Sequence, residues 1–118
     1  MRIGIIKETT AGETRVAATP ETVKKLVAIP GFSVTIESGA GAASSLLDEA
    51  YAAAGATVSA SAAEVLAASD IVLKVRAPGA EELAAMRSGT HLVGMLNPFN
   101  ADGIAAIKGK GVNGFSLE

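Results

Sequence analysis

The fold of this chain is decided by its opening residues, Arg2-Ile-Gly-Ile-Ile-Lys-Glu-Thr-Thr-Ala-Gly-Glu-Thr-Arg-Val-Ala-Ala-Thr-Pro20. Residues 3–6 are apolar and predict a buried strand, and a polar loop that includes Glu8 and Arg15 follows at once. Thr19-Pro20 predicts a helix start, because threonine is a favoured N-cap and proline lacks only an N–H that the first turn leaves unbonded. Ligands of open α/β sheets bind outside the carboxyl ends of the strands. The charged loop is therefore a candidate site.

The rest of the chain alternates apolar runs with helix-like stretches, each bounded by turn or capping residues. We expect strands at residues 3–6, 32–37, 57–58, 71–75, 91–96 and 112–117, and helices that begin near residues 20, 48, 62, 81 and 101. Strands that alternate with helices form βαβ units, and right-handed crossovers place helices on both faces of the sheet. The predicted fold class is α/β: one flavodoxin-like or Rossmann-like domain over residues 1–118, with three α/β/α layers and a mostly parallel sheet.

The composition narrows the classes of partner. Of the 118 residues, 49% are hydrophobic and 3% aromatic, which predicts a core of alanine, valine, leucine and isoleucine. The formal net charge is −2 and the basic residues form no stripe, so we expect no nucleic-acid partner. The chain has no cysteine, which excludes disulfides and thiolate zinc sites and fits a cytoplasmic protein; we expect no bound metal. No run approaches the ~18 apolar residues of a membrane span, so direct membrane insertion is not expected.

Two cations are the strongest candidates for a binding site. Lys74 interrupts the apolar run Ile71–Val75 near its carboxyl end, where a buried lysine is costly unless it is paired or faces a cleft. Arg15 belongs to the loop after the first strand and can bind a carboxylate through two parallel hydrogen bonds. The alternatives are a lysine that reaches solvent at the strand end and a solvated arginine. Glu8 could orient either cation or be an exposed acid, and Asn97 could donate to a ligand or complete a turn.

Other motifs give weaker signals. Gly39-Ala-Gly41 follows a strand and resembles part of a dinucleotide fingerprint, but the third glycine of that pattern would fall at Ser44, so we interpret it as a tight turn. His91 is the single histidine and begins a strand, away from the carboxyl ends, where packing is its expected role. With no Ser/His/Asp set and no phosphate loop, the sequence names no catalytic residue.

Taken together, these motifs resemble the start of the alanine dehydrogenase and proton-translocating transhydrogenase family. The similarity covers essentially the whole chain. It is carried by the opening stretch through Pro20, by Val34-Thr-Ile-Glu-Ser-Gly-Ala-Gly-Ala42, by Asp48 to Gly55, and by Asp70-Ile-Val-Leu-Lys-Val75 with Pro78. In alanine dehydrogenases of this family, the arginine and lysine that match Arg15 and Lys74 bind the substrate carboxylate. Their catalytic histidine has no counterpart in Leu96-Asn97-Pro98-Phe99, which favours the transhydrogenase alpha subunits.

The resemblance implies further properties of a longer protein. It would transfer hydride between NAD(H) and NADP(H), and most contacts to the cofactor would lie beyond Glu118, in a dinucleotide-binding domain. These 118 residues alone are then expected to be inactive and to bind no nucleotide tightly. The implied partners are membrane and NADP-binding subunits or domains, with a homodimer of the parent, at the cytoplasmic side of the inner or plasma membrane. The alternatives are part of an NAD-dependent alanine dehydrogenase, or a stand-alone flavodoxin-like binding module such as a signalling receiver.

Overall fold

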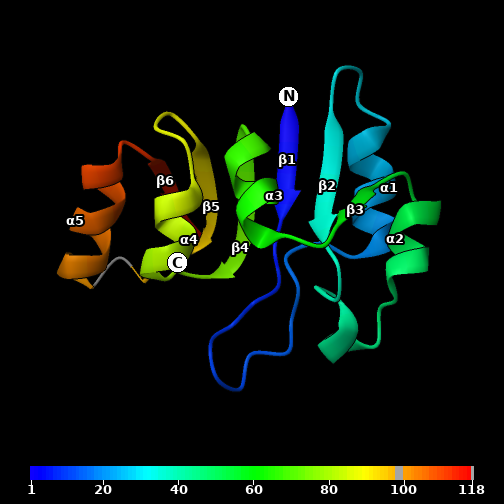
Figure 1. Cartoon of the computed structure of the whole chain (residues 1–118), viewed down its shortest axis with the longest axis horizontal. Helices are drawn as coiled ribbons and strands as arrows, with labels where there is room; N and C mark the ends of the chain where they lie inside the picture. Colours follow the sequence, from blue (N-terminus) through cyan, green and yellow to red (C-terminus); the bar gives the residue numbers. More distant parts are fainter. Residues whose placement is uncertain (98–99, 118) are drawn as a thin grey trace.

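A six-stranded parallel sheet forms the centre of the computed structural model, which describes residues 1–97 and 100–117. The strands are β1 (Arg2–Ile5), β2 (Ser33–Glu37), β3 (Thr57–Ser59), β4 (Ile71–Arg76), β5 (His91–Met95) and β6 (Asn113–Ser116). Their order across the sheet is β3-β2-β1-β4-β5-β6 (Figure 1). This is the doubly wound order of Rossmann folds.

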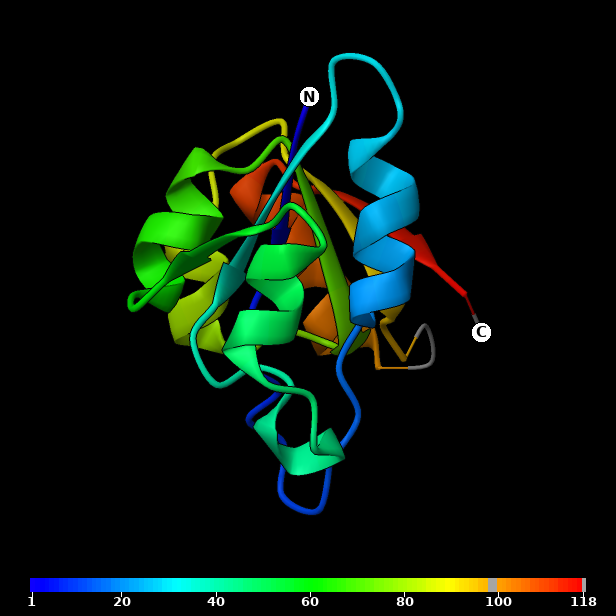
Figure 2. The same cartoon turned by 90° about the vertical axis from the view of Figure 1, so that its right-hand side faces the viewer.

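Helices cover both faces of this sheet. They are α1 (Pro20–Val27), α2 (Asp48–Ala53), α3 (Ala62–Ala68), α4 (Ala80–Ala85) and α5 (Ala101–Lys110), together with the short 3₁₀ helix η1 (Ala42–Ser44). The first two pack on one face and the last three on the other, and Figure 2 shows α1 and α3 on opposite sides of the strands. The predicted three-layer α/β/α arrangement is confirmed.

The core is divided into two halves by the sheet, because successive side chains of a strand point to opposite faces. On the face covered by α1 and α2, the core consists chiefly of Ile3, Ile5, Val23, Val34, Ile36 and Tyr51. On the other face it consists chiefly of Leu66, Val72, Leu83, Met86, Leu92 and Ile107. Aliphatic residues therefore fill the core on both faces, as the composition predicts.

Local capping signals set the helix starts. The Thr19 hydroxyl accepts a hydrogen bond from the Thr22 N–H at 3.2 Å, and the Ser61 hydroxyl accepts one from the Glu64 N–H at 3.2 Å. Asp48, which we expected to act as a cap, is instead the first residue of α2. Its carboxylate accepts hydrogen bonds from the turn that follows β2, so it stabilises that turn rather than its own helix.

The strand order reverses between β1 and β4. From β1 the chain crosses over α1 to β2 on one side, and from β4 it crosses over α4 to β5 on the other side. The loops that leave β1 and β4 therefore diverge at the carboxyl edge of the sheet, which is the usual ligand position in such folds. The long loop after β1 extends beyond this edge in Figure 1. In the described parts of the chain, no helix is long and apolar enough to cross a membrane.

Candidate functional site at the β1–β4 switch point

A β-bulge in β4 shapes the candidate site. Leu73 pairs with Val93 of β5, but the next pair is Arg76 with Met95, so β4 carries one more residue than β5 between these positions. The facing residue on β5 is Gly94, where a Cβ atom would collide with the carbonyl oxygen of Lys74. Bulges redirect side chains and often lie beside functional sites. This bulge places Lys74 at the carboxyl end of β4, close to the loop that follows β1.

Glu8 satisfies the backbone groups that the bulge leaves without a ladder partner. Its Oε2 accepts the Val75 N–H at 3.0 Å and its Oε1 accepts the Arg76 N–H at 3.0 Å. Only 1% of the Glu8 side chain is exposed. The sequence left open whether Glu8 is an exposed acid, and the structure shows a buried carboxylate bound to the bulge.

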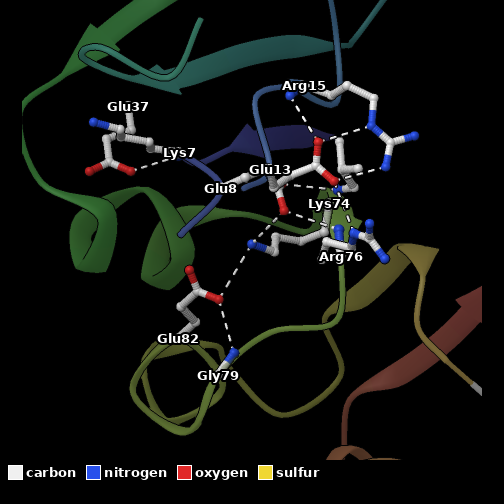
Figure 3. A network of polar contacts seen from close by, with 10 residues as sticks. Lys7, Glu8, Glu13, Arg15, Glu37, Lys74, Arg76, Gly79 and Glu82 are labelled. Carbon is white, nitrogen blue, oxygen red and sulfur yellow. Dashed lines mark hydrogen bonds and ion pairs between the residues drawn. The ribbon is translucent and has the colours of Figure 1, made fainter. Parts of the chain in front are cut away.

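The Lys74 side chain is buried as well, and its ammonium lies between two carboxylates. Its Nζ is 3.1 Å from Oε1 of Glu8 and 3.4 Å from Oε1 of Glu82, and only 2% of the side chain is exposed (Figure 3). Glu82 comes from the first turn of α4 and also accepts the Gly79 N–H at 3.0 Å. Pairing offsets the large cost of burying a lone charge. Lys74 therefore does not reach solvent, and Glu8 orients Lys74 rather than Arg15.

A second ionic network lies beside the first and contains Arg15. The Arg15 guanidinium donates from Nε and Nη2 to the two oxygens of Glu13 at 2.9 and 2.8 Å, a bidentate pair. Arg76 donates from its Nε to the same carboxylate at 2.9 Å. These hydrogen bonds, those from Arg15 first, hold the pKa of Glu13 well below its usual range. The two guanidinium side chains remain about half exposed, at 56% and 52%.

The structure places the predicted residues in three ways. Lys74 and Glu8 are in direct contact, and Arg15 lies in the neighbouring network, where Glu13 occupies its guanidinium (Figure 3). Asn97 is exposed after β5 in a left-handed conformation with φ 52°, and its carbonyl accepts the Asn100 N–H at 3.0 Å. Pro98 and Phe99, the next residues of the stretch compared with the family, lie outside the described residues. His91 begins β5, and its ring packs against Phe115, as expected for a packing role.

Sequence reasoning missed two members of the networks, Arg76 and Glu82. Arg76 lies two residues after Lys74, and without the bulge it would share the orientation of Lys74. Glu82 lies three residues after Gly79, which is the spacing of a capping box, and that local signal could have found it.

A hollow of about 540 Å³ adjoins the lysine network between α3 and α4. Its walls include Thr9 from the loop after β1, Ala62 and Leu66 from α3, and Ala80 and Glu82 from α4. Most of these side chains are small or apolar. The volume is within the roughly 300–1,000 Å³ that is usual for small-molecule sites.

The glycine-containing turn after β2 does not fit the phosphates of a dinucleotide. Its amides are already bonded within the protein: the Gly39 N–H donates to Asp48 at 2.9 Å and the Ala42 N–H to the Gly39 carbonyl at 3.1 Å. A phosphate cradle needs such amides free. The interpretation of this stretch as a structural turn is confirmed.

Comparisons with known proteins agree with this architecture. The profile of the family described as "Alanine dehydrogenase/PNT, N-terminal domain" matches residues 4–118. An NAD(P) transhydrogenase alpha subunit of Rhodospirillum rubrum is 40% identical over 124 residues, covering 100% of this chain and 32% of the relative. Alanine dehydrogenase of Methanococcus maripaludis is 41% identical over 92 residues, covering 78% of this chain and 24% of the relative.

Solved structures give the same result. The transhydrogenase from Sinorhizobium meliloti superposes with a TM-score of 0.94 at 39% identity, over 100% of this chain and 34% of that one. An L-alanine dehydrogenase superposes with a TM-score of 0.92 at 30% identity, over 98% of this chain and 32% of that one. The chain thus spans about a third of the length of these relatives. It belongs to the alanine dehydrogenase/PNT N-terminal domain family.

Proposed function

We propose that this chain is the N-terminal domain of an NAD(P) transhydrogenase alpha subunit, whose whole polypeptide transfers hydride between NAD(H) and NADP(H). One observation carries this proposal: the sequence match to a transhydrogenase alpha subunit extends over 100% of the chain, whereas the alanine dehydrogenase matches extend over 78% and 82%. Hydride transfer between two nicotinamides requires positioning and no protein nucleophile. A domain without a catalytic residue of its own is compatible with that reaction.

Within such a subunit, the charged networks at the switch point would bind an anionic group. Lys74 and Arg15 are the proposed cations, Glu8 positions Lys74, and Asn97 borders the same edge of the sheet. The dinucleotide contacts would lie in the further domain that we expect beyond Glu118, because the turn after β2 does not fit them. We also propose membrane and NADP-binding partner subunits or domains, a homodimer of the parent, and a cytoplasmic position peripheral to the inner or plasma membrane.

The test uses the full-length subunit reconstituted with its partner subunits in vesicles. We expect NADH to reduce an NADP analogue, with proton movement across the vesicle membrane. If the complete complex oxidises no NADH when the analogue is supplied, the proposal is wrong. Calorimetry of the 118 residues alone supplies a second readout, because the proposal predicts weak or no NADH binding there, and low-micromolar affinity would contradict it.

An alanine dehydrogenase is the second candidate. The observation that favours it is the pair of cations Arg15 and Lys74 at one switch point, since such a pair suits a small carboxylate substrate. Oxidation of NADH by the full-length protein that depends on both pyruvate and ammonium would establish this candidate. The same assay without ammonium is its control.

A further inference from the structure

The two carboxylates that bind Lys74 are held very differently. Glu8 lies 3.1 Å from Nζ, its side chain is 1% exposed, and two backbone N–H groups of the bulge fix its position. Glu82 lies 3.4 Å from Nζ, its side chain is 15% exposed, and its further hydrogen bond comes from the Gly79 N–H at the start of its own helix. Glu8 is therefore a fixed partner of Lys74, and Glu82 is the partner that can leave.

Glu82 also occupies the position through which a ligand would reach Lys74. It lines the hollow between α3 and α4, whereas the buried Lys74 does not. In Figure 3 the ammonium of Lys74 lies between Glu82 on the α4 side and the Glu8 segment on the other. A molecule in the hollow would meet the Glu82 carboxylate first, and it would contact Lys74 only after that carboxylate moves.

Charge makes this exchange obligatory for an anion. Glu8, Glu82 and Lys74 together carry a formal charge of −1 when all three are ionised, so a third carboxylate would be repelled from the ammonium. The contact between Glu82 and Lys74 also shows that this position accepts a carboxylate. We infer that Glu82 is an internal stand-in for the ligand, which occupies Lys74 until a small carboxylate displaces it. This inference rests on the anion-binding role proposed above for Lys74, but not on hydride transfer.

The consequence is selectivity. Ligands without a carboxylate cannot replace Glu82 on Lys74, so they leave the network closed. For a carboxylate, the apparent affinity falls by the fraction of molecules in which Lys74 is free. If Glu82 occupies Lys74 in roughly nine of ten molecules, removing it tightens binding by about tenfold.

The test measures acetate binding to the full chain by following the NMR signal of the Lys74 side chain, with chloride holding the ionic strength constant. Glu82→Gln keeps the size of the side chain and an acceptor for the Gly79 N–H, but it loses the charge that holds Lys74. We expect it to tighten acetate binding by about tenfold. Glu81→Gln is the matched control: Glu81 lines the same hollow and the charge change is identical, but the described contacts of Lys74 do not include it. We expect a change of less than about twofold there, the size of a weak surface electrostatic effect.

Glu82→Asp separates the contact from the charge. It keeps the negative charge but shortens the side chain by one methylene, so the carboxylate no longer reaches Lys74 at bonding distance, and acetate should again bind more tightly. A thermal melt of each variant shows that it is folded. Unchanged or weaker acetate binding in Glu82→Gln and Glu82→Asp would overturn the inference, as would an equal gain in Glu81→Gln or a wild-type response that survives Lys74→Met. A failed hydride-transfer assay with tighter acetate binding in Glu82→Gln would overturn only the proposed function.

Discussion

Glu8 holds the bulge in β4 and neutralises Lys74 at the same time, so its replacement tests both roles. In Glu8→Gln, the side chain keeps its size but has one carbonyl oxygen in place of two carboxylate oxygens. That oxygen can accept either the Val75 N–H or the Arg76 N–H, and the new amide group would direct its own donors at the other N–H and at Lys74. The variant therefore removes an ion pair and leaves a bulge N–H without an acceptor.

The magnitude follows from the two losses. Breaking a buried ion pair costs about 3–5 kcal/mol, and the low end applies because Glu82 still contacts Lys74. An unbonded buried N–H adds about 1–3 kcal/mol. We therefore expect Glu8→Gln to lower the free energy of unfolding by about 4 kcal/mol, a large part of the roughly 5–15 kcal/mol that is typical of a domain. Lys74→Met should cost about 3 kcal/mol, because Glu8 then loses its counter-ion but keeps both backbone hydrogen bonds.

Urea unfolding followed by far-UV circular dichroism measures both values. With a slope of about 2 kcal/mol per molar urea, Glu8→Gln should lower the midpoint by roughly 2 M. Glu49→Gln on α2 is the control, since this glutamate is exposed and its replacement should change stability by less than about 0.5 kcal/mol. If Glu8→Gln costs less than Lys74→Met, the bulge amides do not depend on Glu8 and the reasoning is refuted.

Three further predictions concern the fold around the site. Gly94→Ala should lower the free energy of unfolding by more than about 2 kcal/mol, because its Cβ collides with the bulge carbonyl, whereas Gly79→Ala has open space and should cost far less; urea midpoints compare them. Tyr51→Phe should cost about 1–2 kcal/mol in the same assay, because the buried Ala18 carbonyl loses a hydrogen bond of 2.7 Å. The pKa of Asp48 is lowered, chiefly by the hydrogen bond from a serine hydroxyl, so its contribution is present above the unfolded pKa of about 3.9 and is lost as the pH falls. The stability difference between wild type and Asp48→Asn should therefore shrink below about pH 4, and a constant difference down to pH 2 would contradict this.

The elements of the fold were predictable because their signals are local. Apolar runs bounded by glycine, proline or capping residues gave each strand of the described sheet to within about two residues, as for β1, expected at residues 3–6 and observed at Arg2–Ile5. The 3₁₀ helix η1 was not predicted, since its small residues carry no hydrophobic period. It begins after Gly41, packs near Leu46, and ends at Ser45 with φ 60°.

The site was only partly predictable because its geometry depends on pairing between distant residues. Lys74 was conspicuous as a charge within an apolar strand, but nothing near it in the sequence shows a bulge. The bulge exists because β4 and β5 pair out of step, and Gly94, about twenty residues later, permits it. The partnership of Glu8 with the bulge spans 67 residues along the chain, so composition and periodicity could not reveal it.

The charges of the two networks balance, and this balance decides which cation is easier to free. Glu13 faces two arginines, so the arginine network carries a formal charge of +1, while Lys74 faces two glutamates in a network of −1. Removing Glu13 from Arg15 would leave two guanidinium groups without their shared partner, and the depressed pKa of Glu13 keeps this carboxylate ionised under ordinary conditions. Removing Glu82 from Lys74 leaves the ammonium still paired with Glu8. Electrostatics therefore favours exchange at the buried lysine, although the arginines are the more exposed cations.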